Sequence, residues 1–290
     1  MLMKMLRGVA GRATTPAPTL PEVIYLEQTP ELRLVVPPDN SYAAVVNSLQ
    51  GVLIIARQDA GVGWQLTTRG AYDAEQMATL DLLARACPPG AVALDIGANI
   101  GVAALTMARA VGPAGMVHAF EPQRVLFHML AGNMALNSID NVYVYHQAVG
   151  DAPGTAKVPR LDYRLDTSFG SIELNREHQS DAHQQAQGGV FDSVAMISID
   201  SLALPRVDFI KIDVEGMEPE VLSGAAQTIA RCRPLLYVEY LKTGRQAAAD
   251  PLLRAGYALF DIVDNFVCIP EEHPRLRELA GNVERWTGTY

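Results

Sequence analysis

From residue 91 onward, the sequence alternates short apolar runs with stretches that have helical spacing. The apolar runs start at Ala91, Gly115, Val142, Val207 and Leu235. Strands that alternate with helices form βαβ units, and these build a mostly parallel sheet with helices on both faces. Two further runs, residues 257–261 and 266–269, lie too close together for a crossover helix, so we expect an antiparallel pair at the sheet edge. The alternation predicts an α/β fold.

The segment before this alternation has a different composition. Residues 1–40 are rich in proline, which disfavours helices and sheet ladders, so we expect an extended arm. Residues 52–55 and 64–67 are β-rich runs around a glycine-containing loop, and this pattern predicts a β-hairpin. We therefore divide the chain into an N-terminal appendage, residues 1–71, and one large domain, residues 72–290, whose first helix is capped by Asp73.

A polar stretch interrupts the alternation at about residues 150–196. Long polar insertions are uncommon in α/β domains, and those that occur are usually lids or binding loops. We expect this stretch to serve such a role.

Charge and composition narrow the classes of partner. The chain has 290 residues, with 23 Lys and Arg against 32 Asp and Glu, which gives a net charge of −9. An acidic chain repels phosphate backbones, so nucleic acid is not an expected partner. No apolar run reaches the roughly 20 residues of a membrane helix, and we expect a cytoplasmic protein. The three cysteines, Cys87, Cys232 and Cys268, form no CxxC pair, so we assign no metal site to them.

The most informative local motif is LDIGANIG, residues 94–101, between a strand and a helix. Gly97 allows a tight turn, and Gly101 allows the helix to press against the sheet or a ligand to approach the backbone. Asn99 occupies the place of the second glycine in the dinucleotide fingerprint, which argues against a pyrophosphate and an NAD-dependent oxidoreductase. Asp95 suits a cationic ligand, such as the methionine part of S-adenosylmethionine.

The next two strands also end in groups suited to a nucleoside. Glu121 and Pro122 follow the second strand, where a carboxylate can accept hydrogen bonds from both ribose hydroxyls. The third strand ends near Ala148, where backbone groups can meet an adenine edge.

A family resemblance rests on several motifs in order. They are GAYD (70–73), LDIGANIG (94–101), EPQ (121–123), NV (141–142), AVGD (148–151), IKIDVEG (210–216) and EVLSGA (220–225). Together they resemble the FkbM family of S-adenosylmethionine-dependent methyltransferases over about residues 70–239. The resemblance implies a class I methyltransferase (Rossmann-like) fold, with seven strands in the order 3-2-1-4-5-7-6, and O-methylation of sugar or polyketide hydroxyls. It also suggests that residues 167–171 line an acceptor pocket.

Under this hypothesis, one set of residues binds the cofactor. The set is Asp95, Gly97, Ala98, Asn99, Gly101, Glu121, Pro122, Ala148 and Asp213.

Three acids at the fourth and fifth strand ends are the candidate catalytic residues. Asp213 and Glu215 follow the fourth strand, and Glu239 ends the fifth. Such acids can take the proton of an acceptor hydroxyl, or two of them can hold a divalent cation that lowers its pKa. Methyl transfer from a sulfonium also gains much from positioning alone. The sequence leaves base and metal both open.

These observations favour an S-adenosylmethionine-dependent methyltransferase that methylates a hydroxyl of a sugar, a glycan or a secondary metabolite. Two alternatives stay open, because the motifs report the cofactor more than the acceptor. One is N- or C-methylation of a small molecule. The other is a non-catalytic nucleoside-binding scaffold of the same fold.

Overall fold

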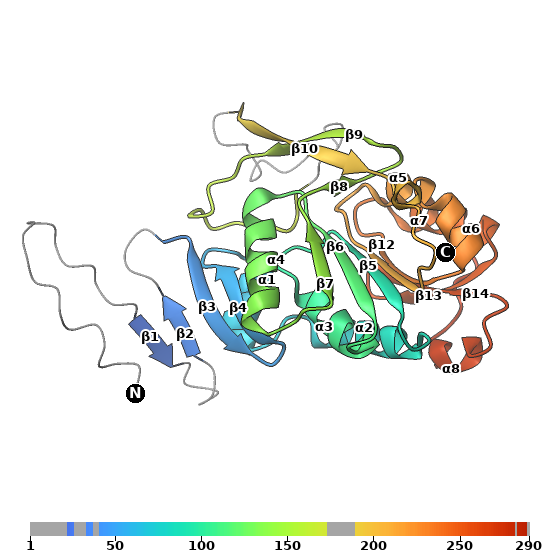
Figure 1. Cartoon of the computed structure of the whole chain (residues 1–290), viewed down its shortest axis with the longest axis horizontal. Coiled ribbons are helices and arrows are strands. Elements are labelled where there is room, and N and C mark those ends of the chain that lie inside the picture. Colours follow the sequence, from blue (N-terminus) through green and yellow to red (C-terminus); the bar gives the residue numbers. More distant parts are fainter. Residues whose placement is uncertain (1–21, 26–32, 37–40, 173–188, 282, 289–290) are drawn as a thin grey trace, which may run out of the picture.

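A computed structural model of the whole chain describes residues 22–25, 33–36, 41–172, 189–281 and 283–288 (Figure 1). Its main sheet has seven strands. They are β5 (Val92–Ile96), β6 (Met116–Phe120), β7 (Val142–Tyr145), β11 (Phe209–Ile212), β12 (Leu235–Glu239), β13 (Tyr257–Ile262) and β14 (Asn265–Pro270). The spatial order is β13-β14-β12-β11-β5-β6-β7. In chain order this is 3-2-1-4-5-7-6 from the β7 edge, so the expected α/β fold and strand order are confirmed.

The directions of the strands also agree with the expectation. β7, β6, β5, β11 and β12 are parallel, whereas β14 is antiparallel to both β12 and β13. The parallel strands therefore end at one edge, where open α/β sheets bind ligands.

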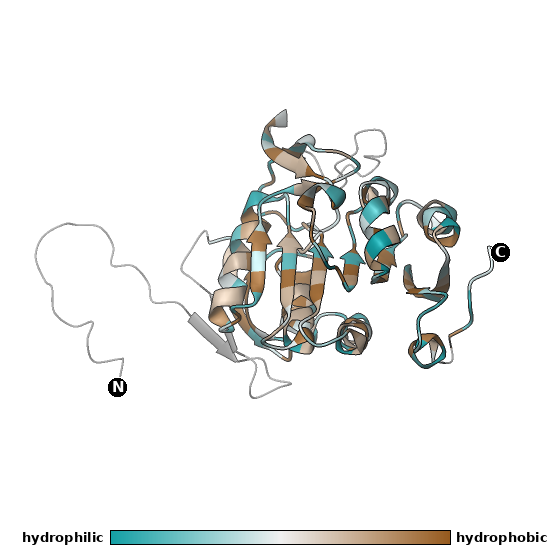
Figure 2. Cartoon of the chain, turned by 45° about the vertical axis from the view of Figure 1, so that its right-hand side comes forward, coloured by the Kyte–Doolittle hydropathy of each residue, from teal (hydrophilic) through white to brown (hydrophobic). Residues whose placement is uncertain are grey.

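Helices cover both faces of this sheet. They are α2 (Ala74–Ala86), α3 (Val102–Val111), α4 (Arg124–Leu136), α5 (Glu218–Ser223), α6 (Ala226–Cys232), α7 (Arg245–Arg254) and α8 (Leu276–Ala280). Neighbouring strand residues face opposite sides, so Ala93 packs with α2, α3 and α4, and Leu94 packs with α5, α6 and α7. Figure 2 shows hydrophobic residues concentrated along the strands of the sheet.

The N-terminal region forms a second sheet and a helix. Its strands are β1 (Glu22–Tyr25), β2 (Arg33–Val36), β3 (Ala43–Ser48) and β4 (Gly51–Ala56), joined in that order, and α1 (Val62–Arg69) follows. The predicted strand at residues 64–67 is wrong, because these residues lie in α1. Val62 and Leu66, one helical turn apart, are both buried in the core. The strand partner of β4 is β3. Within the proline-rich arm, β1 and β2 pair with each other as antiparallel strands.

Two asparagines attach this second sheet to the main fold. Asn133 lies on α4 and Asn137 directly follows its last residue, and the side-chain amide of each both donates to and accepts from the backbone of one residue of β4. Ile54 N donates to Asn133 Oδ1 (2.6 Å), and Asn133 Nδ2 donates to Ile54 O (3.1 Å). Val52 N donates to Asn137 Oδ1 (3.1 Å), and Asn137 Nδ2 donates to Val52 O (2.7 Å). The core residues of β3, β4 and α1 belong to the same cluster as those of α2 and α3. The division of the chain at residue 71 stays a prediction.

The two ends of the polar stretch at residues 150–196 contain β-strands. β8 (Ala148–Val149), β9 (Gly154–Pro159) and β10 (Phe191–Ile197) form a three-stranded sheet in the order β8-β10-β9, followed by the short helix η4 (Asp200–Leu202). This sheet lies along the top of the molecule in Figure 1. Residues 173–188 of the stretch lie outside the described residues. In the described part of the chain, none of the helices is both long and apolar enough to cross a membrane.

Candidate active site at the carboxyl ends of the parallel strands

A cavity of about 280 Å³ opens at the carboxyl ends of β5, β6, β11 and β12. Its walls come from segments at residues 61–76, 96–103, 120–126, 147–149, 168–172, 211–217 and 239–242. We call residues 96–100, 120–123 and 147–149 the glycine-turn side. We call Asp213, Glu215, Glu239 and Lys242 the acid side.

The glycine turn is fixed by its own hydrogen bonds. Gly97 has φ of 79°, and a Cβ at this position would overlap the carbonyl oxygen of Asp213. The amides of Gly97 and Ala98 donate to Phe120 O, the amide of Asn99 to Glu121 Oε2, and that of Ile100 to Asn99 Oδ1. With these donors already used, the turn does not offer the amides that bind a phosphate in dinucleotide sites. This agrees with the absence of the dinucleotide fingerprint.

Glu121 is buried at the wall beside this turn. Its Oε2 accepts from Asn99 N (2.8 Å) and its Oε1 from Gln123 N (2.8 Å). Burial raises the pKa of Glu121 to about 7, against the opposing effect of these two hydrogen bonds. Each carboxylate oxygen has a second lone pair, so Glu121 can still accept hydrogen bonds from a ligand in the cavity.

The other predicted residues of this side also reach the cavity. Ala98, Asn99, Pro122 and Ala148 all line it. Asn99 adopts a left-handed conformation with φ of 51°, which asparagine tolerates better than most residues.

Two of the residues predicted to bind the cofactor, Asp95 and Gly101, do not line the cavity. Asp95 has 0% exposure and lies behind the wall, where its Oδ1 is 3.3 Å from Lys211 Nζ. Burial raises the pKa of Asp95, and Lys211 opposes this shift. Gly101, also outside the lining, lacks a side chain because a Cβ would press on Leu130 and Met134 of α4. Both positions are packed against the protein interior, so their part in cofactor binding stays a prediction.

Lys211 is a residue of the site that the sequence reasoning did not single out. It is 4% exposed on β11, directly beside Asp95 of β5 in the sheet register. Its Nζ lies 3.3 Å from Asp95 Oδ1, 3.3 Å from Asp213 Oδ2 and 2.8 Å from Gly97 O. The signal was present, because a lysine inside the apolar run FIKI is buried only with a compensating charge.

The acid side brings the three predicted catalytic carboxylates together. Asp213, Glu215 and Glu239 place carboxylate oxygens within 4.8 Å of one another, a spacing that suits a divalent cation. Lysines already neutralise two of them, since Lys211 pairs with Asp213 and Lys242 Nζ lies 3.1 Å from Glu215 Oε2. Glu218 is not one of these three carboxylates. Its Oε1 instead accepts hydrogen bonds from the backbone amides of Val214 and Gly216.

Crowding of charge changes the protonation of this side. Burial, followed by Asp213 and Glu215, raises the pKa of Glu239 to about 9. Burial and Asp213 raise the pKa of Glu215 to about 7, although Lys242 opposes this. Glu239 Oε2 is buried without a hydrogen-bond partner among the described residues. Burial and the neighbouring carboxylates thus favour the protonated form of both Glu239 and Glu215.

The remaining wall comes from two segments that lie far apart in the sequence. Gln65, Tyr72 and Gln76 come from the N-terminal region and α2, and Ser168 and Ser171 come from the segment after β9. Burial and Asp213 raise the pKa of Tyr72. Ser168, Gly170 and Ser171 of the segment 167–171 line this cavity, and Gln65, Tyr72 and Gln76 add three residues that were not among the predicted site residues.

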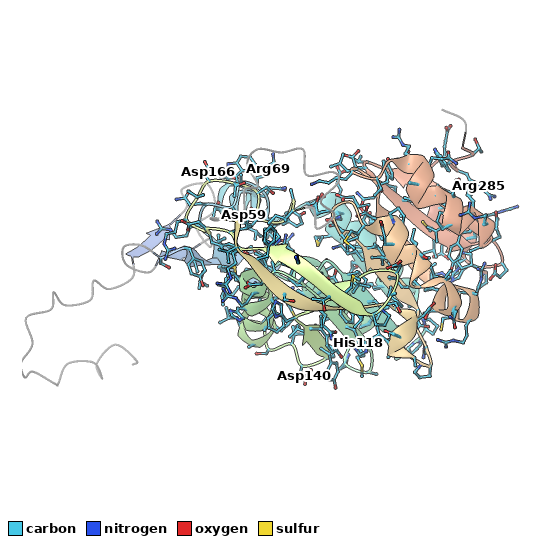
Figure 3. All side chains as sticks on the ribbon, turned by 90° about the horizontal axis from the view of Figure 1, so that it is seen from above. Asp59, Arg69, His118, Asp140, Asp166 and Arg285 are labelled. Carbon is cyan, nitrogen blue, oxygen red and sulfur yellow. The ribbon has the colours of Figure 1, made fainter. Side chains whose placement is uncertain are left out.

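Asp59 joins these two segments. Its Oδ1 accepts from Gly61 N (3.1 Å) and Phe169 N (3.3 Å), and its Oδ2 accepts from Gly63 N (2.8 Å). Figure 3 shows Asp59 and Asp166 on the same side of the molecule, with His118 on another side. His118 Nδ1 lies 2.9 Å from the hydroxyl of Tyr145, and His118 does not line the cavity.

The strand order and the helices on both faces of the sheet are those of the class I methyltransferase fold. A sequence model of the methyltransferase FkbM domain matches residues 95–279, which is more than half of the chain. The chain therefore belongs to the FkbM methyltransferase family, and the resemblance drawn from the motifs is confirmed.

Individual relatives are more distant. The chain is 29% identical over 242 residues to the AMB antimetabolite synthetase AmbE of Pseudomonas aeruginosa, and the match covers 68% of this chain and 11% of that protein. It is 27% identical over 161 residues to the methyltransferase sdnD of Sordaria araneosa, covering 47% of this chain and 61% of that protein. The chain thus spans less than two thirds of the length of each of these relatives.

Solved structures of methyltransferases are also similar. An FkbM methyltransferase from Methylobacillus flagellatus is 20% identical with a TM-score of 0.39, covering 57% of this chain and 36% of that one. An S-adenosylmethionine-dependent O-methyltransferase from Thermotoga maritima is 10% identical with a TM-score of 0.41, covering 86% and 79%. Both scores are low, so the family assignment rests on the sequence match.

Proposed function

We propose that this protein transfers a methyl group from S-adenosylmethionine to a hydroxyl oxygen of a sugar, a glycan or a secondary metabolite. The observation that carries the proposal is the cavity itself. In it, the glycine turn, Glu121 and three carboxylates face one space at the carboxyl ends of the parallel strands. The net charge of −9 supports a small acceptor over a nucleic acid.

The glycine-turn side fits the nucleoside part of the cofactor. Glu121 would accept hydrogen bonds from the ribose hydroxyls, while Pro122 and Ala148 would line the space for the base. Gly97, Ala98 and Asn99 would border the methionine part, with Asp213 facing its ammonium group. Asp95 and Gly101 would support this site from behind the wall, through Lys211 and α4.

The acid side fits the acceptor and its proton. Bound S-adenosylmethionine supplies an electrophilic methyl group, so the acceptor oxygen needs alignment and a place for its proton. Glu215, whose pKa is about 7, is suited to accept that proton near neutral pH. Glu239 would donate a hydrogen bond while neutral, and Asp213 would hold the acceptor close to the cofactor. A divalent cation is not needed for these steps, and the two lysine pairs make it the less favoured choice.

The wall of Gln65, Tyr72, Gln76, Ser168 and Ser171 would receive the rest of the acceptor. Amide and hydroxyl groups of this kind match the hydroxyls of a carbohydrate in hydrogen-bonding capacity. We propose residues 72–290 as the methyltransferase domain, with residues 61–65 of the preceding region completing its acceptor wall.

Calorimetry with S-adenosylhomocysteine tests the cofactor assignment. We expect saturable binding to one site. Absence of binding by a protein with a normal circular dichroism spectrum would disprove it.

Incubation with methyl-labelled S-adenosylmethionine and a panel of glycosides, amines and carbon nucleophiles tests the acceptor class. Label on a hydroxyl oxygen is expected. Label on nitrogen or carbon would move the assignment to N- or C-methylation. Cofactor binding with no transfer to any member of the panel would favour the scaffold alternative.

A further inference from the structure

Lys211 stands out among the buried charged residues because the proposed reaction does not use it. It lines the cavity, yet three protein oxygens within 3.3 Å surround its Nζ: Asp95 Oδ1, Asp213 Oδ2 and Gly97 O. Lys211 Nζ donates a hydrogen bond to Gly97 O, and the carboxylates of Asp95 and Asp213 balance its charge as ion pairs. All three of these contacts are made with the protein itself, so we look for the role of Lys211 in the groups that it holds in place.

Each of these neighbours belongs to a different part of the site. Gly97 O belongs to the peptide that leads into the glycine turn, so a bond to this oxygen sets the plane of the Gly97–Ala98 peptide. Asp213 is the first residue after β11 and lies on the acid side. Asp95 stands beneath both, fully buried, and its carboxylate oxygens have no hydrogen-bond partner of normal geometry among the described residues. Its compensation is the charge of Lys211.

The backbones of the two loops are also in contact. A Cβ on Gly97 would overlap Asp213 O, and Asp213 N donates to Ile96 O at 3.1 Å. Lys211 adds a side-chain link across the same junction. Burial alone would lower the pKa of Lys211, but Asp213 and Asp95 raise it above its ordinary value, so the side chain is a permanent cation.

We propose that Lys211 is the positioning residue of the cofactor site, holding the Gly97 carbonyl and the Asp213 carboxylate at a fixed spacing before the cofactor binds. Asp95 is the buried counter-charge that keeps the lysine in place. The inference rests on the proposed function, because the turn matters only if it holds S-adenosylmethionine. It assigns Asp95 an indirect role in place of the direct contact that the motif suggested.

Removing the lysine alone is a poor test, because it leaves two carboxylates without a counter-charge and is expected to destabilise the fold. The double variant Lys211→Met/Asp95→Asn removes the buried charges together. We expect it to melt cooperatively and to bind S-adenosylhomocysteine at least tenfold more weakly than the wild type, measured by calorimetry. Lys157→Met, which removes an exposed lysine on β9, is the matched control and should bind as the wild type does.

Hydrogen exchange separates positioning from general stabilisation. In the folded double variant, amides of residues 97–101 should exchange faster while those of β5 and β11 stay protected. In the ligand-free wild type, the same turn amides should already be protected and should gain little when S-adenosylhomocysteine binds. The wild-type measurement requires no variant to fold.

The outcomes are distinguishable. A wild type that does not bind S-adenosylhomocysteine refutes the proposed function and this inference with it. A wild type that binds, with a double variant that binds within twofold of it, refutes the inference alone. Turn amides that become protected only upon binding would also overturn it, as would faster exchange across the whole sheet of the variant.

Discussion

The two sides of the cavity satisfy their polar groups in different ways. On the glycine-turn side, the backbone amides of residues 97–100 and of Gln123 all donate to protein oxygens at 2.7–3.1 Å, and Glu121 accepts two of these bonds. On the acid side, three carboxylates crowd together and Glu239 Oε2 has no hydrogen-bond donor among the described residues. The difference indicates that the first side is built before the ligand arrives, whereas the second is completed by it.

The largest expected effect comes from adding a side chain at Gly97, where the glycine turn lies against the backbone of Asp213. Gly97→Ala should abolish measurable binding of S-adenosylhomocysteine, because the added methyl group overlaps Asp213 O and the left-handed backbone is strained. Calorimetry and a melting curve check this.

Gly90→Ala is the matched control for backbone strain alone. Gly90 also has a positive φ, of 71°, but its Cβ would meet no atom closer than 3.5 Å. It should cost roughly 1–2 kcal/mol of stability and leave affinity unchanged. Equal binding by both variants would contradict the close approach of the two loops.

A smaller effect should follow from Glu121→Ala. Loss of the hydrogen bonds to the ribose should weaken S-adenosylhomocysteine binding by about 1.5–3 kcal/mol, or roughly 10- to 150-fold, without unfolding the protein. Asp140→Ala, which removes an exposed acid after α4, provides the control, and Figure 3 labels its position. An unchanged affinity would reduce Glu121 to a structural support for the turn.

On the acid side, replacing a glutamate by glutamine should have a smaller effect on cofactor-product affinity than the same replacement on the glycine-turn side. Glu239→Gln should alter S-adenosylhomocysteine affinity by less than about threefold at neutral pH, because a carboxyl group with a pKa of about 9 is already neutral there. Calorimetry alongside Glu121→Gln makes the comparison direct. A larger loss for Glu239→Gln than for Glu121→Gln would reverse the assignment of the two sides.

A separate effect, on stability and not on affinity, is a pH dependence that comes from Glu121. Its folded pKa of about 7 lies above its ordinary value of 4.5, so the folded state binds more protons between these pH values. The contribution of Glu121 to stability is complete below about pH 4.5 and declines as pH rises to about 7. Urea titrations across this range should show a shallower decline for Glu121→Gln. An identical slope would mean that Glu121 is ionised in the folded protein.

Much of the fold could be predicted from the sequence because its signals are local. The apolar runs of the parallel strands, the glycine turn and the cap at Asp73, whose Oδ1 accepts from Gln76 N, all lie within a few residues of chain. The strand predicted at residues 64–67 was wrong, because a short run that contains apolar residues fits a strand or a buried helix turn equally well. Its assignment to α1 depends on the core that Val62 and Leu66 enter.

The sequence by itself determined where the strands of the main sheet, the glycine turn and the acids at the strand ends lie along the chain, because each depends on neighbouring residues. Only the tertiary structure decided which of these groups share a space. Asp95 and Gly101 turn into packed interfaces, and Lys211 reaches two loops through the register of β11 against β5. Gln65 and Tyr72 join the wall through contacts between distant segments. Such contacts depend on how the layers pack, and no local pattern in the chain specifies that packing.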